Sequence, residues 1–229
     1  MLHFFTALII FLLSHALISR SHLRDILVRK TGEKNYLLLY SLLSLVLLTW
    51  LITAAIHAPR IVLWPWAHWT YWIPNVLMPF AFILFAAGLI SPNPLSVSFR
   101  RGGFDPEKPP LTAALTRHPV MWGFFLWAAA HIPTNGEFPI GFMFLLFAGF
   151  AIAGLKLIDR KYIKKMGREN WEQLARNTHP LLFCSPALRK RDFTVTGYDI
   201  TGICAGIALY MLFYSLHGYF FAITPLPPF

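Results

Sequence analysis

The feature that most constrains this chain is a series of apolar stretches long enough to cross a lipid bilayer. A transmembrane helix needs about 20 mostly apolar residues. Six stretches of the 229-residue chain meet or approach this length. They cover approximately residues 2–19, 36–56, 69–90, 111–132, 138–157 and 200–223. The sequence therefore predicts an all-α, polytopic integral membrane protein with about six transmembrane helices.

The composition excludes the soluble and the disordered alternatives. Hydrophobic residues make up 56% of the chain and charged residues only 13%, whereas soluble domains average about 45–50% and about 25%. So few charges cannot cover so much apolar surface in water. The two cysteines provide neither a disulfide framework nor a Cys-x-x-Cys metal site.

The net charge of +10 follows the same pattern of spans. Nineteen of the 20 basic residues fall in alternate connecting segments, ten of them in 156–198, and Arg60 is the exception. Cytoplasmic loops of membrane proteins carry an excess of Lys and Arg. This distribution predicts a single membrane domain, 1–229, with both termini on the non-cytoplasmic side. It also accounts for the basic excess without a nucleic-acid partner.

The first span is predicted to be a retained helix rather than a signal peptide. No basic region precedes it, no small-residue cleavage site follows it, and Arg20 and Arg24 come next. No Ser/Arg-rich transit extension precedes it either. We therefore expect a multi-pass protein of the bacterial inner (plasma) membrane, with the lipid bilayer as its main partner.

The segment 156–167 is predicted to be a basic amphipathic helix ending at Gly167. Its apolar residues recur at helical spacing, between lysines and an arginine. One interpretation is a helix resting on anionic headgroups. The other is a docking face for a partner or an anionic ligand.

Histidines are the candidate functional residues, because ionisable groups within apolar spans are costly and are candidates by default. Neutral imidazole can ligate heme iron. The alternative is that each histidine bonds a neighbouring helix or a headgroup. His15 and His118 are expected near the inner side of the membrane, and His57 and His131 near the outer side.

Pro119 is predicted to interrupt the fourth span. It lacks a backbone donor and its ring clashes with the preceding turn, so the helix either kinks there or starts there. Irregular backbone at membrane depth is tolerated where it is buried in protein or lines a cavity. Arg117 and His118 are therefore candidate ligand-lining residues at the inner face. No motif of a soluble enzyme is present, so no catalytic residue is predicted.

The residues of the fourth span and its flanks resemble the pattern of a known protein family. They read Arg117-His118-Pro119-x-x-x-Gly123, then Trp127-Ala-Ala-Ala-His131, then Asn-Gly-Glu, and Ser-His15 lies upstream. This combination resembles the NnrU family of bacterial membrane proteins over about residues 1–185, with an extra C-terminal span at 200–223.

The resemblance implies a role linked to denitrification, in nitrite and nitric oxide metabolism, with related membrane partners. The family is similar to 15-cis-zeta-carotene isomerase, a heme b protein, which implies His15 and His131 as ligands of the heme iron. His57 falls near a third histidine of that enzyme, while Ala128 replaces its cysteine. His15 and His118 are both expected on the inner side, whereas His131 lies about 20 Å from His118 along an ideal helix. A His15/His118 pair is therefore the alternative.

A more distant similarity is to the isoprenylcysteine methyltransferases, which implies an S-adenosylmethionine site around Arg117, His118 and Asp159. The pattern departs from that group at its tyrosine position, which is Trp122 or Met121 here, and in having one acidic residue, Asp159, where the group has two. Three functions thus stay open. They are heme-dependent isomerase or redox chemistry on an apolar or small-molecule substrate, methyl transfer, and a non-enzymatic accessory role.

Overall fold

The computed structural model describes residues 1–20, 22–65, 67–221 and 223–226. Over these residues it forms helices and no strand, which confirms the all-α prediction. The chain divides into two compact units, Met1–Pro65 with Gly136–Met143, and Trp66–Asn135 with Phe144–Phe229.

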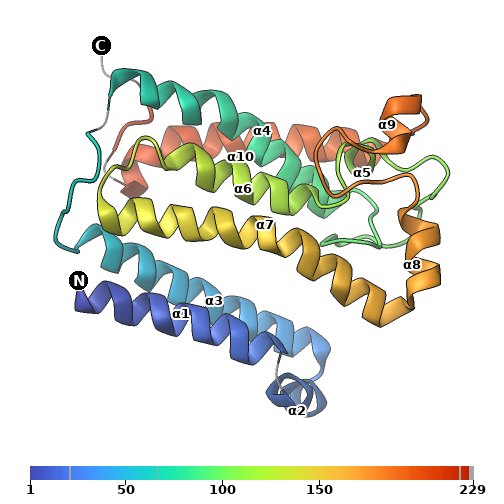
Figure 1. Ribbon diagram of the computed structural model, residues 1–229, viewed down its shortest axis with the longest axis horizontal. Coiled ribbons are helices and arrows are strands. Elements are labelled where there is room, and N and C mark those ends of the chain that lie inside the picture. The colour runs from blue at the N-terminus through green and yellow to red at the C-terminus, as the bar shows by residue number, and fades with distance from the viewer. Residues whose placement is uncertain (21, 66, 222, 227–229) are drawn as a thin grey trace. The chain divides into compact units, whose positions relative to one another are not determined.

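The first unit is built on two long helices joined by a short one (Figure 1). They are α1 (Leu2–Arg20), α2 (His22–Thr31) and α3 (Glu33–Ile56). Gly32, at φ 80°, allows the turn between α2 and α3. The α1 and α3 helices run antiparallel, because His3 accepts a 2.7 Å hydrogen bond from Trp50 while His15 packs edge-on against Tyr40.

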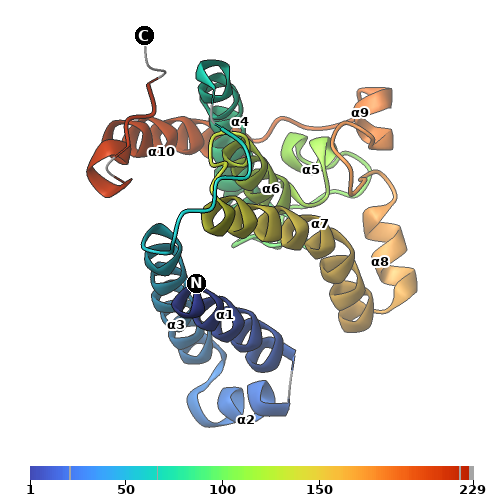
Figure 2. The same cartoon turned by 60° about the vertical axis from the view of Figure 1, so that its left-hand side comes forward.

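The second unit has α4 at its centre, packed between α6 and α10 (Figure 2). Its elements are η1 (His68–Tyr71), α4 (Trp72–Ile90), α5 (Leu111–Leu115), α6 (Pro119–His131), most of α7 (Phe138–Met166), α8 (Arg168–Ala175), α9 (Pro186–Lys190) and α10 (Gly197–Phe221). Glycines permit the close contacts: Gly123 of α6 meets the backbone of α4, as do Gly202 and Gly206 of α10. Small residues serve this purpose between helices in lipid.

Four helical segments within the described residues are long and apolar enough to cross a membrane. They are Glu33–Ile56, His68–Ile90, Phe138–Met166 and Gly197–Phe221. They correspond to the second, third, fifth and sixth predicted spans. The six-span count and the orientation of the termini stay predictions.

The fourth predicted span, about 111–132, is not one continuous helix in the structure. It consists of α5 and α6, separated by an extended break at Thr116–His118. The 13 residues of α6 extend only about 20 Å at 1.5 Å per residue, less than the hydrocarbon thickness of about 30 Å.

The basic segment after residue 156 is not a separate helix. It continues α7 without interruption to Met166, and Gly167 ends it at φ 85°, as predicted. Tyr162 and Leu155 are 5% and 6% exposed. Part of the apolar side of this segment therefore packs into the protein at Tyr162, whereas Leu157 is 39% exposed. Both interpretations of the segment, a helix resting on headgroups and a docking face, stay predictions.

Candidate functional site: a buried Arg–His–Asp cluster at the start of α6

The break before α6 follows from its sequence. Pro119 is the first residue of α6, where its missing N–H costs nothing. The preceding residue, His118, avoids the helical region at φ −123° and ψ 62°, as residues before proline do. Of the two alternatives predicted at Pro119, a kink or a helix start, the structure shows the start. The break turns Arg117 and His118 inward, leaving them 6% and 0% exposed.

The Arg117 guanidinium is held by three groups of the second unit. Its Nη1 donates to Asp159 Oδ2 over 2.8 Å, and its Nε donates to Thr178 Oγ1 over 2.9 Å. The guanidinium also lies over the ring of Trp171, 4.6 Å from the centroid. The side chains of Arg117 and Asp159 are 7% and 17% exposed, so this ion pair is largely removed from water.

Asp159 also fixes the imidazole of His118. His118 Nε2 lies 3.0 Å from Asp159 Oδ1, and Nδ1 lies 2.9 Å from Ser96 Oγ. A carboxylate only accepts, so Nε2 carries the proton and Nδ1 accepts from the Ser96 hydroxyl. Arg117, His118 and Asp159 are together called the Arg–His–Asp cluster.

The hydrogen-bond order Ser96–His118–Asp159 is that of a nucleophilic triad, but its placement is not. In such triads the serine hydroxyl must reach the substrate. Ser96 is 0% exposed, and Tyr162 closes over it with a 3.0 Å hydrogen bond from its hydroxyl to the Ser96 carbonyl. We therefore interpret the arrangement as one that locks the loop after α4 to α7, not as a nucleophile with its base.

Loop 177–183 covers the break in the backbone between α5 and α6. Arg117 N donates to the His179 carbonyl over 2.7 Å, and Thr116 Oγ1 donates to the Pro180 carbonyl over 2.9 Å. Trp122 Nε1 donates to that same Pro180 carbonyl over 2.8 Å. Polar groups freed by the broken helix are thus satisfied by protein, as irregular backbone near a membrane requires.

Burial gives His118 a pH-dependent effect on stability. Burial lowers the pKa of His118 below its usual value, although hydrogen bonding and charge attraction from Asp159 oppose this and Arg117 adds to it. The folded protein therefore binds fewer protons at this site than the unfolded chain once the pH falls below about 6.5.

We expect the free energy of unfolding to fall as the pH drops below about 6.5, because the unfolded state takes up the proton first. Thermal unfolding in detergent between about pH 8 and pH 5 measures this. The control is His118→Gln, whose side chain does not titrate and whose midpoint should depend less on pH. Equal pH dependence in both proteins would contradict the assignment.

The four histidine candidates do not converge on one place within either unit. His118 and His131 lie at opposite ends of α6, about 20 Å apart along the helix. In the first unit, His15 packs on Tyr40 of α3. His57 follows the end of α3, 17 residues and about 25 Å along the helix from Tyr40. The pairs His15/His131 and His15/His118 join different units and stay predictions.

His131 has the ring geometry of a potential metal ligand. Its Nδ1 lies 2.7 Å from the Trp127 carbonyl. A carbonyl only accepts, so the neutral ring carries its proton on Nδ1 and its lone pair on Nε2. The faces of the ring pack against aromatic groups, with Phe144 stacked at 4.9 Å and Trp127 at 5.9 Å. His15 and His57 likewise direct Nδ1 at carbonyls of their own helices, at 2.9 and 2.8 Å.

A second buried carboxylate was missed by the sequence analysis. Asp199 is 0% exposed. Its Oδ1 accepts from Ser91 and Thr112, and its Oδ2 accepts from the hydroxyl and the amide of Thr196. The signal was the pattern Thr196-x-x-Asp199 at the start of α10, which forms a reciprocal cap. All these partners are donors, so Asp199 joins α4, α5 and α10 rather than binding a cation.

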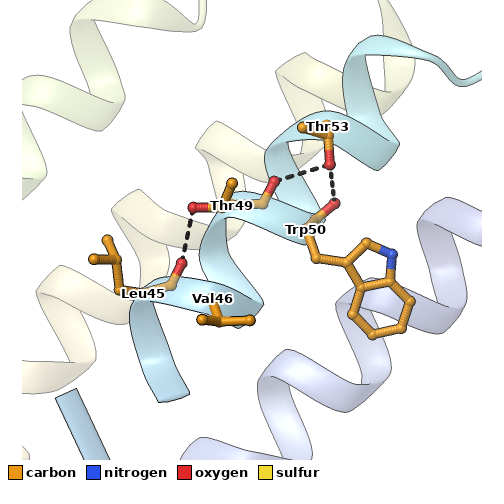
Figure 3. Close-up of a pocket in the computed structure, with 5 residues that line it drawn as sticks. All are labelled: Leu45, Val46, Thr49, Trp50 and Thr53. Atoms are coloured by element: carbon orange, nitrogen blue, oxygen red, sulfur yellow. Dashed lines mark hydrogen bonds between the residues drawn. The ribbon is translucent and has the colours of Figure 1, made fainter. Parts of the chain in front are cut away.

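The α3 helix carries an open groove of about 450 Å³ on its surface (Figure 3). Its lining is Leu45, Val46, Thr49, Trp50 and Thr53. Both threonine hydroxyls are bonded to carbonyls of their own helix, and the groove contains no titratable group. It is an apolar surface suited to contact with lipid chains, not a site for chemistry.

The fold and the site together define a helical protein with several spans apolar enough for a membrane and a buried ionic cluster at one helix break. The family model described as NnrU protein matches residues 3–225. The chain therefore belongs to the NnrU family, and the match includes α10. No curated protein and no solved structure matches the chain.

Proposed function

We propose that this protein binds heme b and that His131 would be one of the residues that hold the heme iron. The observation that carries the proposal is the His131 imidazole, whose Nδ1 donates to the Trp127 carbonyl. Histidines that ligate metals usually donate their other ring N–H to a carbonyl or carboxylate, which fixes the tautomer and the ring orientation. The donor chemistry of His131 thus fits heme iron.

For His15, a role as a ligand of the heme iron would rest on the family resemblance, and the surroundings of its ring are those of the first unit alone. Its Nδ1 lies 2.9 Å from the Phe11 carbonyl, so its ring has the same tautomer as that of His131. The rings of Phe11 and Tyr40 lie beside it, at 4.3 and 5.8 Å. The surroundings of both histidines are apolar and aromatic, which suits a porphyrin.

Bound heme supplies one-electron chemistry, with a potential set by its axial ligands. We assign the protein a role in nitrite or nitric oxide metabolism, on the strength of its NnrU membership. The second role we retain is heme-dependent isomerisation or redox chemistry on an apolar substrate, because the residues around His131 are apolar.

The Arg–His–Asp cluster makes His118 a poorer candidate ligand. Both of its ring nitrogens are engaged, by Ser96 and Asp159. The methyltransferase alternative places its cofactor at these same residues. Their polar atoms face one another, so we assign the cluster to structure and the chemistry to the histidines within the helices.

Protein purified from heme-replete cells is expected to show a Soret band that His131→Gly abolishes or strongly weakens. Added imidazole should restore the band by occupying the vacated position, which separates loss of a ligand from loss of folding. His3→Gln is the control, because His3 Nε2 already accepts a hydrogen bond from Trp50. The absence of heme from the purified wild-type protein, or an unchanged band in His131→Gly, would overturn the proposal.

A further inference from the structure

We propose that the exposed cationic side of the last turns of α7 binds the headgroups of anionic phospholipids. This surface, called the α7 cationic face, consists of the exposed side chains Lys156, Arg160, Lys161, Lys164 and Lys165. Within the described part of the chain, none of the five forms an ion pair with a carboxylate. The inference is independent of heme binding.

The five cations are segregated from the buried side of the same helix. At 3.6 residues per turn they cover about half of its circumference. The opposite half carries Leu155 and Tyr162, which are 6% and 5% exposed. Tyr162 is fixed there by hydrogen bonds with Arg101 and the Ser96 carbonyl. These bonds fix the rotation of the last turns of α7 about the helix axis, with the five cations facing outward.

The Arg–His–Asp cluster leaves this face without a carboxylate. Asp159 is the sole carboxylate between residues 156 and 168. Its two oxygens are bound to Arg117 and His118, on the inner side of the helix. It therefore neutralises a buried arginine rather than the neighbouring lysines. Five positive charges are left without a local counter-charge, and such a surface attracts anionic ligands.

The position of the face along α7 selects lipid headgroups over a soluble acidic partner. The apolar part of α7, residues 138–157, is about 30 Å long, which equals the thickness of the hydrocarbon layer, and Lys156 lies in its last turn. Because the helix is continuous, Arg160 and Lys161 follow within about 6 Å of the end of this apolar part. That is the depth of the headgroups, and Lys and Arg side chains readily extend to it. Lys164 and Lys165 lie about 11–12 Å beyond it, where salt screens the attraction more.

The test uses the full-length protein in detergent, titrated with phosphatidylglycerol or phosphatidylcholine, with bound lipids counted by native mass spectrometry. The wild-type protein should prefer phosphatidylglycerol, and added salt should weaken that preference. The variant Arg160→Gln/Lys161→Gln should bind phosphatidylglycerol about 10- to 30-fold more weakly. The variant Lys164→Gln/Lys165→Gln should lose less of its affinity for phosphatidylglycerol.

The matched control is Arg168→Gln/Arg176→Gln, which removes the same charge from cations that are already paired, with Glu172 and Glu107. It should change phosphatidylglycerol binding by less than about threefold, because its local charge is already compensated. Thermal unfolding in phosphatidylcholine alone should be the same for all variants. The proposal is overturned if wild-type protein does not prefer phosphatidylglycerol, or if the control loses as much as Arg160→Gln/Lys161→Gln. An equal loss would mean that binding follows net charge and not this face.

Discussion

Asp159→Ala is expected to lower the free energy of unfolding of the second unit by about 3–5 kcal/mol, because it leaves the buried guanidinium of Arg117 without its counter-charge. Arg117 is 6% exposed and cannot regain water without moving the loop at 177–183, which its backbone and side chain bind. The same change removes the acceptor of His118 Nε2. Alanine favours helix, so the loss does not come from α7 itself.

Thermal and denaturant unfolding in detergent measure this loss, and two comparisons define its cause. Glu172→Ala breaks an exposed i, i+4 ion pair with Arg168 and should cost at most about 1 kcal/mol. Arg117→Met/Asp159→Leu removes both buried charges and should recover much of the stability lost in Asp159→Ala. If Asp159→Ala behaves like Glu172→Ala, the cluster does not hold the second unit together.

The helix break shows what local sequence rules can predict. Pro119 restricts its own residue and the one before it, so the start of α6 follows from two positions alone. Gly167 likewise ended α7 where expected, because its φ of 85° is one that glycine adopts without strain. Most apolar spans could also be predicted from the sequence, since four of the six predicted stretches match helices long enough to cross a membrane.

One local feature and several long-range contacts were missed from the sequence. The basic residues after 156 favour helix and contain no breaker before Gly167, so α7 simply continues. Its rotation is set by Tyr162 and Asp159, whose partners lie in other elements 41 to 66 residues away. Arg117, His118 and Asp159 came together in the sequence analysis through the resemblance to methyltransferases. Ser96 and Thr178 carry no local signal that predicts their contacts with His118 and Arg117. The pattern Thr196-x-x-Asp199 predicts a helix cap but not the contacts of Asp199 with Ser91 and Thr112.

The packing of α4 against α10 depends on glycines whose neighbours are main-chain atoms. A Cβ at Gly206 would lie 2.5 Å from Ile83 Cα and 2.8 Å from Ile83 N. These distances are too short for any real contact, and a helix backbone cannot turn aside as a flexible side chain can. Gly202 meets Ala87 one turn away in the same manner. A side chain at either position must therefore force the two helices apart.

Gly206→Ala is expected to destabilise the protein by about 3 kcal/mol, at the upper end of the cost of overpacking, because neither backbone can relax without losing contacts along α10. The matched control is Gly149→Ala in α7, where an added Cβ meets nothing within 4 Å. That change should leave stability unaltered or raise it by up to about 1 kcal/mol, since alanine favours helix over glycine. The unfolding midpoint in detergent should thus fall for Gly206→Ala and stay level or rise for Gly149→Ala. If both variants gain stability, α4 and α10 do not pack as closely as these contacts require, because only a wider separation would make room for the methyl group of Gly206→Ala.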